Sequence, residues 1–128
     1  MTATQLGAVQ TRIMQVLWDR EKATAREITD ELNRLTPDAP TAHSTVQTLL
    51  RGLMEKGSVK YETQGRTFVF RAAVAQDKVR KNATRDLLQK TFGGSASDLV
   101  SFLLKNEKVS KKELEEIKKL VNEKSKKR

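Results

Sequence analysis

The sequence of 128 residues contains no cysteine and only one histidine, His43. Without thiols the chain cannot form disulfides, thiolate zinc sites, iron–sulfur clusters or a cysteine nucleophile. One imidazole does not suffice for a multi-histidine metal site, and no nucleophile–base set can be assembled around it. We therefore expect a protein that is not an enzyme and that carries no metal or other cofactor.

The sequence also lacks long apolar runs. No stretch approaches the length needed to span a membrane, and the N-terminus lacks the apolar region of a signal peptide. We expect a cytoplasmic protein that does not insert into membranes. Its length fits one domain or two small ones.

The chain is basic, with a formal net charge of +9 at pH 7. This charge is unevenly spread, because residues 105–128 hold 10 basic and 5 acidic side chains, whereas residues 1–75 hold 10 and 8. Net charge therefore supports a nucleic-acid partner only mildly, and the location of a DNA site must come from local patterns.

Residues 41–57 are the stretch around which the chain is organised, and they predict an amphipathic helix between Pro40 and Gly57. The apolar stripe of this helix consists of Val46, Leu49, Leu50 and Leu53. Its opposite face carries His43, Ser44, Thr45, Gln47, Thr48 and Arg51. Side chains of these types hydrogen-bond base edges in a DNA major groove. The helix alone leaves two interpretations open, a DNA recognition helix or an ordinary amphipathic helix with a polar outer face.

A predicted β-hairpin follows this helix. Residues 58–63 and 66–72 alternate apolar and polar side chains, and they are joined at Gln64-Gly65. A helix with a base-reading face followed by a basic-tipped hairpin is the order of a winged helix-turn-helix. Arg66, at the tip of this wing, can reach a phosphate or an adjacent minor groove. We predict a winged helix-turn-helix DNA-binding domain over residues 1–75, with double-stranded DNA as its partner.

Two helices are predicted before the recognition helix. The first spans about residues 5–20 and is followed by a short connection, residues 21–23, which has room for a small strand. A capping box of Thr24 and Glu27 opens the second helix, whose apolar face consists of Ile28, Leu32 and Leu35.

The C-terminal part, residues 76–128, is predicted to form three helices. The first spans residues 76–92 and stops at Gly93-Gly94, and cap patterns at Ser95 and Ser110 open the other two. So small a unit buries too little surface to be stable alone. Its apolar positions are nonetheless dense, and they are Leu87, Leu88, Leu99, Phe102, Leu103, Leu114, Ile117, Leu120 and Val121.

We predict that these apolar side chains form a homodimer interface, because two-fold assembly is the commonest oligomer. The alternative is that the three helices pack back on the winged domain. The expected fold class is mainly α with a small β wing, an N-terminal winged helix-turn-helix plus a C-terminal three-helix dimerisation region over residues 76–128.

Several segments together carry a resemblance to a known family. They are IMQVLW at 13–18, AREI at 25–28, STVQTLLR at 44–51, KG at 56–57 and FGGS at 92–95. In their order and spacing the chain resembles the penicillinase-repressor family (BlaI/MecI type, with copper-responsive CopY-type relatives). The resemblance implies a repressor that dimerises through its C-terminal helices and binds palindromic operators, typically with TACA/TGTA elements. It assigns DNA reading to Ser44, Thr45, Gln47 and Thr48, with Arg66 at the wing tip.

The chain departs from the family pattern at three points. Gly52 stands where the family usually has arginine, and a helical glycine costs about 1 kcal/mol against alanine. Family members are inactivated when a membrane metalloprotease sensor triggers cleavage between Asn and Phe in a dimerisation helix. The matching pair is Ser101-Phe102, with Ser in place of Asn. Two alternatives stay open: such a sensor is a partner and this bond is cut, or the helix is only structural and release uses another signal. CopY-type relatives sense metal through cysteine pairs, which this chain lacks.

Two functions from different classes remain open. The first is a sequence-specific dimeric repressor, relieved by proteolysis in the dimerisation region. The second is a winged-helix module that binds a protein and not specific DNA. The predicted reading face contains no Asp or Glu, and a protein-docking face would more often expose large apolar residues, so the face favours DNA.

Overall fold

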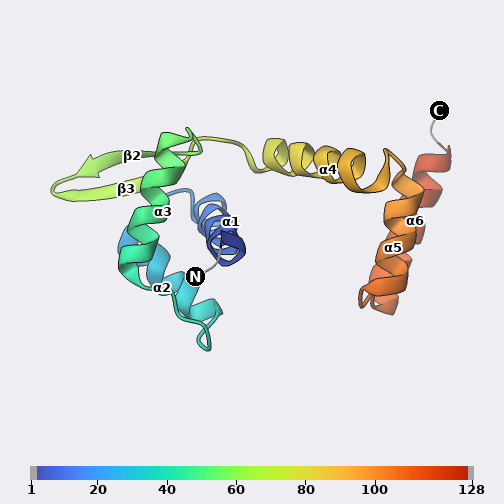
Figure 1. The fold of residues 1–128 in the computed structure, drawn as a ribbon, viewed down its shortest axis with the longest axis horizontal. Coiled ribbons are helices and arrows are strands. Elements are labelled where there is room, and N and C mark those ends of the chain that lie inside the picture. The colour runs from blue at the N-terminus through green and yellow to red at the C-terminus, as the bar shows by residue number, and fades with distance from the viewer. Residues whose placement is uncertain (1–2, 127–128) are drawn as a thin grey trace. The chain divides into compact units, whose positions relative to one another are not determined.

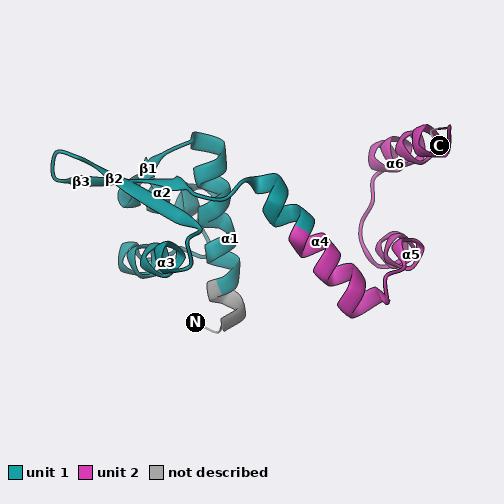
Figure 2. Ribbon diagram, turned by 90° about the horizontal axis from the view of Figure 1, so that it is seen from above, with its two compact units in different colours: residues 1–81 teal, residues 82–128 magenta. Residues whose placement is uncertain are grey.

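A computed structural model describes residues 3–126, with side chains described from residue 7 onward. In chain order its elements are α1 (Ala3–Arg20), β1 (Ala23–Thr24), α2 (Ala25–Leu35), α3 (His43–Glu55), β2 (Val59–Gln64), β3 (Thr67–Ala72), α4 (Gln76–Phe92), α5 (Ala96–Asn106) and α6 (Lys111–Lys126) (Figure 1). The predicted fold class, mainly α with a small β wing, is confirmed. The chain divides into two compact units, residues 1–81 and 82–128, and the division falls inside α4 (Figure 2).

The core of the first unit is built from one face each of α1, α2 and α3. Side chains four apart in a helix share a face, and the largest fully buried side chains are three such pairs, namely Ile13 with Leu17, Ile28 with Leu32, and Val46 with Leu50. Each such burial stabilises the fold by about 1.5–3 kcal/mol. The whole predicted stripe of α3 is buried, so the polar face of α3 points away from the core.

The sheet has three antiparallel strands in the order β1-β3-β2. Pairing of β2 with β3 continues to Gln64 opposite Thr67, so the turn consists of Gly65 and Arg66. Gly65 has φ +64°, which glycine adopts without steric cost at the first position of a two-residue turn. The predicted turn at Gln64-Gly65 is therefore one residue too early, because polar side chains at the end of β2 leave no apolar signal for the register.

Local hydrogen bonds define two helix ends. The Thr24 hydroxyl accepts from the Glu27 N–H at 3.1 Å, and the Glu27 carboxylate accepts from the Thr24 N–H at 2.9 Å. The second of these bonds lowers the pKa of Glu27. At the end of α3 the N–H groups of Gly57 and Ser58 donate to carbonyls of the last turn at 3.0 and 2.9 Å, with Gly57 at φ +81°. The predicted capping box and the helix-ending glycine are both confirmed.

The chain between α2 and α3 is held by a side chain of α2. Asn33 Nδ2 donates to the carbonyl oxygen of Thr41 at 3.1 Å, and the Thr41 N–H donates to Asn33 Oδ1 at 2.7 Å. Thr41 is only 5% exposed, so little water can replace these bonds. This Asn33 clamp fixes the backbone two residues before α3 begins.

Two further hydrogen bonds tie α1 to the segment that follows the wing. Trp18 Nε1 donates to the Val74 carbonyl at 2.9 Å, and Gln76 Nε2 donates to Gln15 Oε1 at 3.1 Å. Trp18 also packs against the core as a partly buried side chain. The base of the wing is thus anchored to the first helix.

One predicted core position is wrong. Leu35 is in helical phase with Ile28 and Leu32, yet it is 54% exposed. It is the last residue of α2, and it borders a small depression of about 90 Å³ whose other side includes Arg12 and Gln15 of α1. Leu35 therefore lies at the end of α2, where no described element covers most of its side chain.

The second unit contains the rest of α4 together with α5 and α6. The helix α4 ends at Gly93 and Gly94, both with positive φ, and the Ser95 hydroxyl caps α5 by accepting from the Asp98 N–H at 3.1 Å. Ser110 caps α6 in the same way. None of these three helices contains a fully buried side chain in its described part. Among residues 3–126, no helix combines the length and the apolar composition needed to cross a lipid bilayer.

We predict that Asn33→Ala lowers the free energy of unfolding by about 1–3 kcal/mol, because it leaves two buried groups of the Thr41 backbone without partners. Chemical denaturation followed by circular dichroism measures this loss. Asp30→Ala, at an exposed position of the same helix, is the control and should change stability by no more than about 0.5 kcal/mol. Equally small effects of both substitutions would show that the Asn33 clamp does not stabilise the fold.

Candidate nucleic-acid interface and apolar surface

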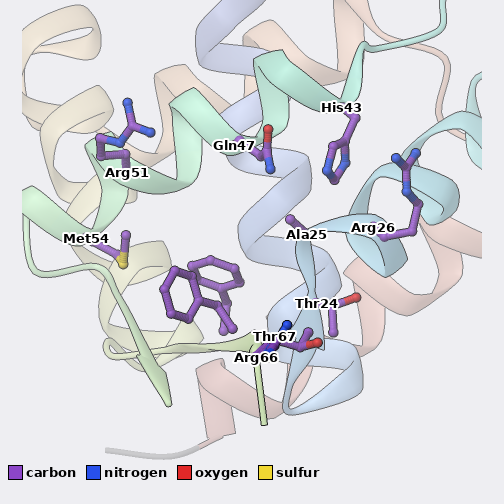
Figure 3. A pocket seen from close by; sticks show the side chains of 11 residues that line it. Thr24, Ala25, Arg26, His43, Gln47, Arg51, Met54, Arg66 and Thr67 are labelled. Atoms are coloured by element: carbon purple, nitrogen blue, oxygen red, sulfur yellow. The ribbon is translucent and has the colours of Figure 1, made fainter. Parts of the chain in front are cut away.

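A groove of about 490 Å³ in the first unit is formed by α3, the wing and the start of α2 (Figure 3). Its lining comprises Thr24, Ala25, Arg26, His43, Gln47, Arg51, Met54, Arg66, Thr67, Phe68 and Phe70. The predicted reading helix and the predicted wing therefore share one surface. We call this surface the α3–wing groove.

The predicted reading residues fall into two sets. His43, Gln47 and Arg51, spaced four residues apart on α3, all line the α3–wing groove. Figure 3 shows the side chains of His43 and Gln47 directed from α3 into it. The other three predicted residues are not part of the lining, and they are Ser44, Thr45 and Thr48.

These three residues differ in solvent exposure and in the hydrogen bonds that they can still form. Ser44 and Thr48 are exposed, whereas Thr45 is half-buried. The Thr48 hydroxyl donates to the Ser44 carbonyl at 3.0 Å. In this conformation Thr48 presents only an acceptor, so Ser44 is the one hydroxyl of the set that is both exposed and free to donate.

The wing contributes Arg66 through its turn. Because Gly65 and Arg66 form the whole turn, the chain reverses at once and Arg66 stands at the tip of the hairpin, as predicted. Figure 3 shows Arg66 next to Thr67 on the wing side of the groove.

Three arginines from three elements line the α3–wing groove. They are Arg26 of α2, Arg51 of α3 and Arg66 of the wing turn. None of the described lining residues is acidic, and the nearby ion pairs of Glu27 and Glu62 engage other arginines. Guanidinium groups bind phosphate through paired N–H donors, so the groove suits a phosphate backbone.

Two residues of α2 that support this site are missing from the sequence-based prediction. Thr29 Oγ1 lies 3.1 Å from His43 Nδ1, and Asn33 clamps Thr41 just ahead of α3. Arg26, in the groove lining, is a third residue that sequence reasoning missed. The available signal was a polar pair, Thr29 and Asn33, four residues apart and each directly after a buried position of α2.

The α3–wing groove offers hydrogen bonding and charge. The Gln47 carboxamide donates and accepts at once, which permits bidentate pairing with adenine. Among the described residues, no group of three His, Asp or Glu side chains is placed to hold a metal ion. The groove therefore suits a ligand that carries several negative charges and also presents hydrogen-bond donors and acceptors.

The predicted dimerisation residues lie on α4, α5 and α6. Five of them are between 43% and 64% exposed, namely Leu87, Phe102, Leu103, Leu120 and Val121. The other four are half-buried, namely Leu88, Leu99, Leu114 and Ile117. Sequence reasoning missed Val100 and Leu104, which line an apolar groove of about 540 Å³ in the second unit together with Ser101 and Val121.

Comparison with known proteins finds one family that matches nearly the whole chain. The profile of the family described as penicillinase repressor matches residues 6–123. A penicillinase repressor of Staphylococcus aureus is 24% identical over 123 residues, which cover 96% of this chain and 95% of the relative. The methicillin resistance regulatory protein MecI of Mammaliicoccus sciuri is 22% identical over 120 residues, covering 94% of this chain and 95% of MecI.

Among solved structures, the solution structure of the DNA-binding domain of the repressor BlaI is similar to part of the chain. It superposes with a TM-score of 0.47 at 25% identity, covering 54% of this chain and 80% of that one.

We predict that two substitutions in the α3–wing groove affect DNA binding differently. Arg66→Ala should weaken binding to specific and random duplexes alike, because phosphate contacts carry no sequence information. It should also reduce the slope of log affinity against log salt by about 0.9. Gln47→Ala should cost about 1–3 kcal/mol on the specific duplex only.

Fluorescence anisotropy at several salt concentrations measures both effects, with a specific duplex selected from a randomised pool. Equal weakening of both duplexes by Gln47→Ala would mean that Gln47 does not read bases.

Proposed function

Because the chain belongs to the penicillinase repressor family, we propose that it is a transcriptional repressor that binds a palindromic operator in double-stranded DNA as a homodimer. Residues 1–75 contact the DNA, and residues 76–128 hold two copies together. The observation that carries this proposal is the α3–wing groove, where His43, Gln47 and Arg51 meet Arg66 of the wing. The names of the relatives, a penicillinase repressor and MecI, support it.

The proposed mechanism separates positioning from reading. The arginines of the groove neutralise backbone phosphates and fix the register of α3 on the duplex. The polar face of α3 then hydrogen-bonds base edges in the major groove. In a two-fold dimer, the two α3 helices read half-sites one helical turn apart, about 34–36 Å, or a multiple of this. Occupation of the operator blocks transcription.

Selection of bound duplexes from a randomised pool, followed by footprinting upstream of the protein's own gene, tests this function. We expect an enriched palindrome whose half-sites each contain a short conserved stretch. A pool that remains random after repeated selection would refute sequence-specific binding.

A second candidate function is a winged-helix module that binds a protein. It is favoured by one observation, the exposed aromatic pair of the wing, Tyr61 and Phe68, which are 51% and 53% exposed with ring centroids 4.8 Å apart. Failure of the duplex selection would leave this candidate.

The proposal of a homodimer rests on the apolar surface of the second unit. Leu103, Leu120 and Val121 leave between 43% and 64% of their surface exposed, and no described side chain of α4, α5 or α6 is fully buried. Apolar surface left in water costs about 25 cal/mol per Å². A second copy of the same chain offers the complementary apolar surface, since a two-fold interface is self-complementary.

We predict that Phe102→Asp converts a dimer into a monomer with a folded winged unit, because burying an unpaired charge in an apolar interface is costly. Sedimentation equilibrium measures the mass and circular dichroism the fold. Asn122→Asp introduces the same charge at an exposed polar position of α6 and should leave the dimer intact. A wild-type monomer at micromolar concentration would refute the proposed dimer.

We further propose that proteolysis between Ser101 and Phe102, triggered by a membrane metalloprotease sensor, relieves repression. Both residues are exposed and lie within α5. A cut there separates residues 102–128, and therefore α6, from the DNA-binding part. Each fragment loses part of the surface that makes the dimer favourable, while the α3–wing groove is unchanged.

We predict that a chain truncated after Ser101 binds a full palindrome up to 10²–10⁴-fold more weakly than the intact chain, because tethering of two weak binders is lost. Its affinity for an isolated half-site should be unchanged, which controls for folding of the winged unit. Anisotropy with both duplexes provides the comparison. Undiminished binding of the palindrome by residues 1–101 would exclude cleavage at this bond as the switch.

A further inference from the structure

We propose that Thr29 is a positioning residue that fixes the imidazole of His43, so that His43 reads a base with an exocyclic amino group, adenine or cytosine, in the major groove. The inference rests on the proposed DNA-binding function and adds a determinant of its sequence specificity. It concerns two helices, because Thr29 belongs to α2 and His43 is the first residue of α3.

The Thr29 hydroxyl makes two polar contacts. Its Oγ1 lies 2.8 Å from the Ala25 carbonyl oxygen and 3.1 Å from His43 Nδ1. A hydroxyl carries one proton, and a carbonyl oxygen only accepts. Both contacts are therefore hydrogen bonds only when the hydroxyl donates to Ala25 and His43 Nδ1–H donates to the hydroxyl. A neutral imidazole in this arrangement keeps its lone pair on Nε2.

Burial of Thr29 stabilises its two hydrogen bonds. Thr29 is 3% exposed, so water has little access to replace a lost partner, and an unsatisfied buried polar group is unfavourable. The ring of His43 is half-buried and lines the α3–wing groove. Among the described residues, no hydrogen bond engages Nε2, which leaves this nitrogen available to a ligand.

The surrounding groove explains which ligand Nε2 would take. Arg26 and Arg51 offer donors only, whereas the His43 lone pair and the Gln47 carbonyl oxygen are the side-chain acceptors that α3 contributes. Figure 3 shows Gln47 and Arg26 on either side of His43. In the major groove the donors are the amino groups of adenine and cytosine, whereas guanine and thymine present acceptors at the corresponding edge. An acceptor nitrogen at His43 therefore selects adenine or cytosine.

The first test measures the ring directly in the full-length protein without DNA. His43 is the only histidine in the sequence, so both ¹⁵N imidazole signals belong to it, and only Nδ1 and Nε2 have to be told apart. At pH 8.5, where an ordinary imidazole is neutral, the wild type should carry the proton on Nδ1. Thr29→Val, which replaces the hydroxyl by a methyl group, should lose this preference, and Thr29→Ser should retain it. A wild-type proton on Nε2 would overturn the proposal, because Nε2 would then be a donor.

The second test repeats the duplex selection with variants. One position of each half-site should be adenine or cytosine with the wild type and with Thr29→Ser, and this preference should disappear with Thr29→Val and His43→Ala. Affinity for the selected duplex should fall about 2- to 10-fold in both of the latter variants, with binding to random duplex unchanged. The double variant should bind no more weakly than His43→Ala. Additive losses would mean that Thr29 does not act through His43 and would overturn the proposal.

A further variant keeps the test decisive if Thr29→Val fails to fold. The carboxamide oxygen of His43→Gln replaces the Nε2 acceptor, so this variant should retain the preference that His43→Ala loses. If wild-type protein enriches no sequence, the proposed function and this inference both fail. If the enriched site depends on Gln47 but on neither His43 nor Thr29, the inference alone is wrong.

Discussion

Burial of the apolar stripe of α3 is the constraint on which the rest of the first unit depends. Because Val46 and Leu50 are fully buried, rotation of α3 about its axis is fixed, and its polar residues must face outward. The Asn33 clamp then fixes where the helix begins, and the Schellman-type end at Gly57 directs the chain into the wing. The position of α3 in the α3–wing groove is thus a product of core packing and helix termini, and the wing supplies the other wall.

The two units differ in how much of their apolar surface they bury within one chain. The first unit closes a core over three helices and a sheet, and among its residues from 7 onward few large apolar side chains are exposed, such as Leu35 and the aromatic pair of the wing. The second unit has strong helix caps but no fully buried side chain in its described part. Local hydrogen bonds therefore define its helices, and the proposed dimer would bury the apolar surface that one chain leaves exposed.

The parts of the structure that depend on local chemistry were predictable from the sequence. The approximate span of α4 was predictable, and its end was marked by Gly93 and Gly94, which adopt positive φ. The exposure of Leu35 was not predictable. Hydrophobic periodicity shows which face of a helix is apolar, but it does not show how far along the helix neighbouring elements cover that face. The contacts of Thr29 with His43 and of Asn33 with the Thr41 backbone were also missed, because the partners lie 14 and 8 residues apart in the sequence. Which polar residues of α3 share the groove with Arg66 depends on the fold of the wing, and that these residues read DNA stays a prediction.

The spacing of His43, Gln47 and Arg51 along α3 limits how many base pairs one copy of the protein can contact. Eight residues of helix rise about 12 Å, and base pairs are about 3.4 Å apart, so one row spans three to four base pairs. Among the roughly 10⁶ sites of a small genome, a given sequence of four base pairs occurs by chance about 4,000 times. A given sequence of eight base pairs occurs on the order of ten times. For the proposed operator, a single winged unit therefore cannot distinguish its site from thousands of chance matches, however tightly it binds, and a second copy reduces these matches to the order of ten.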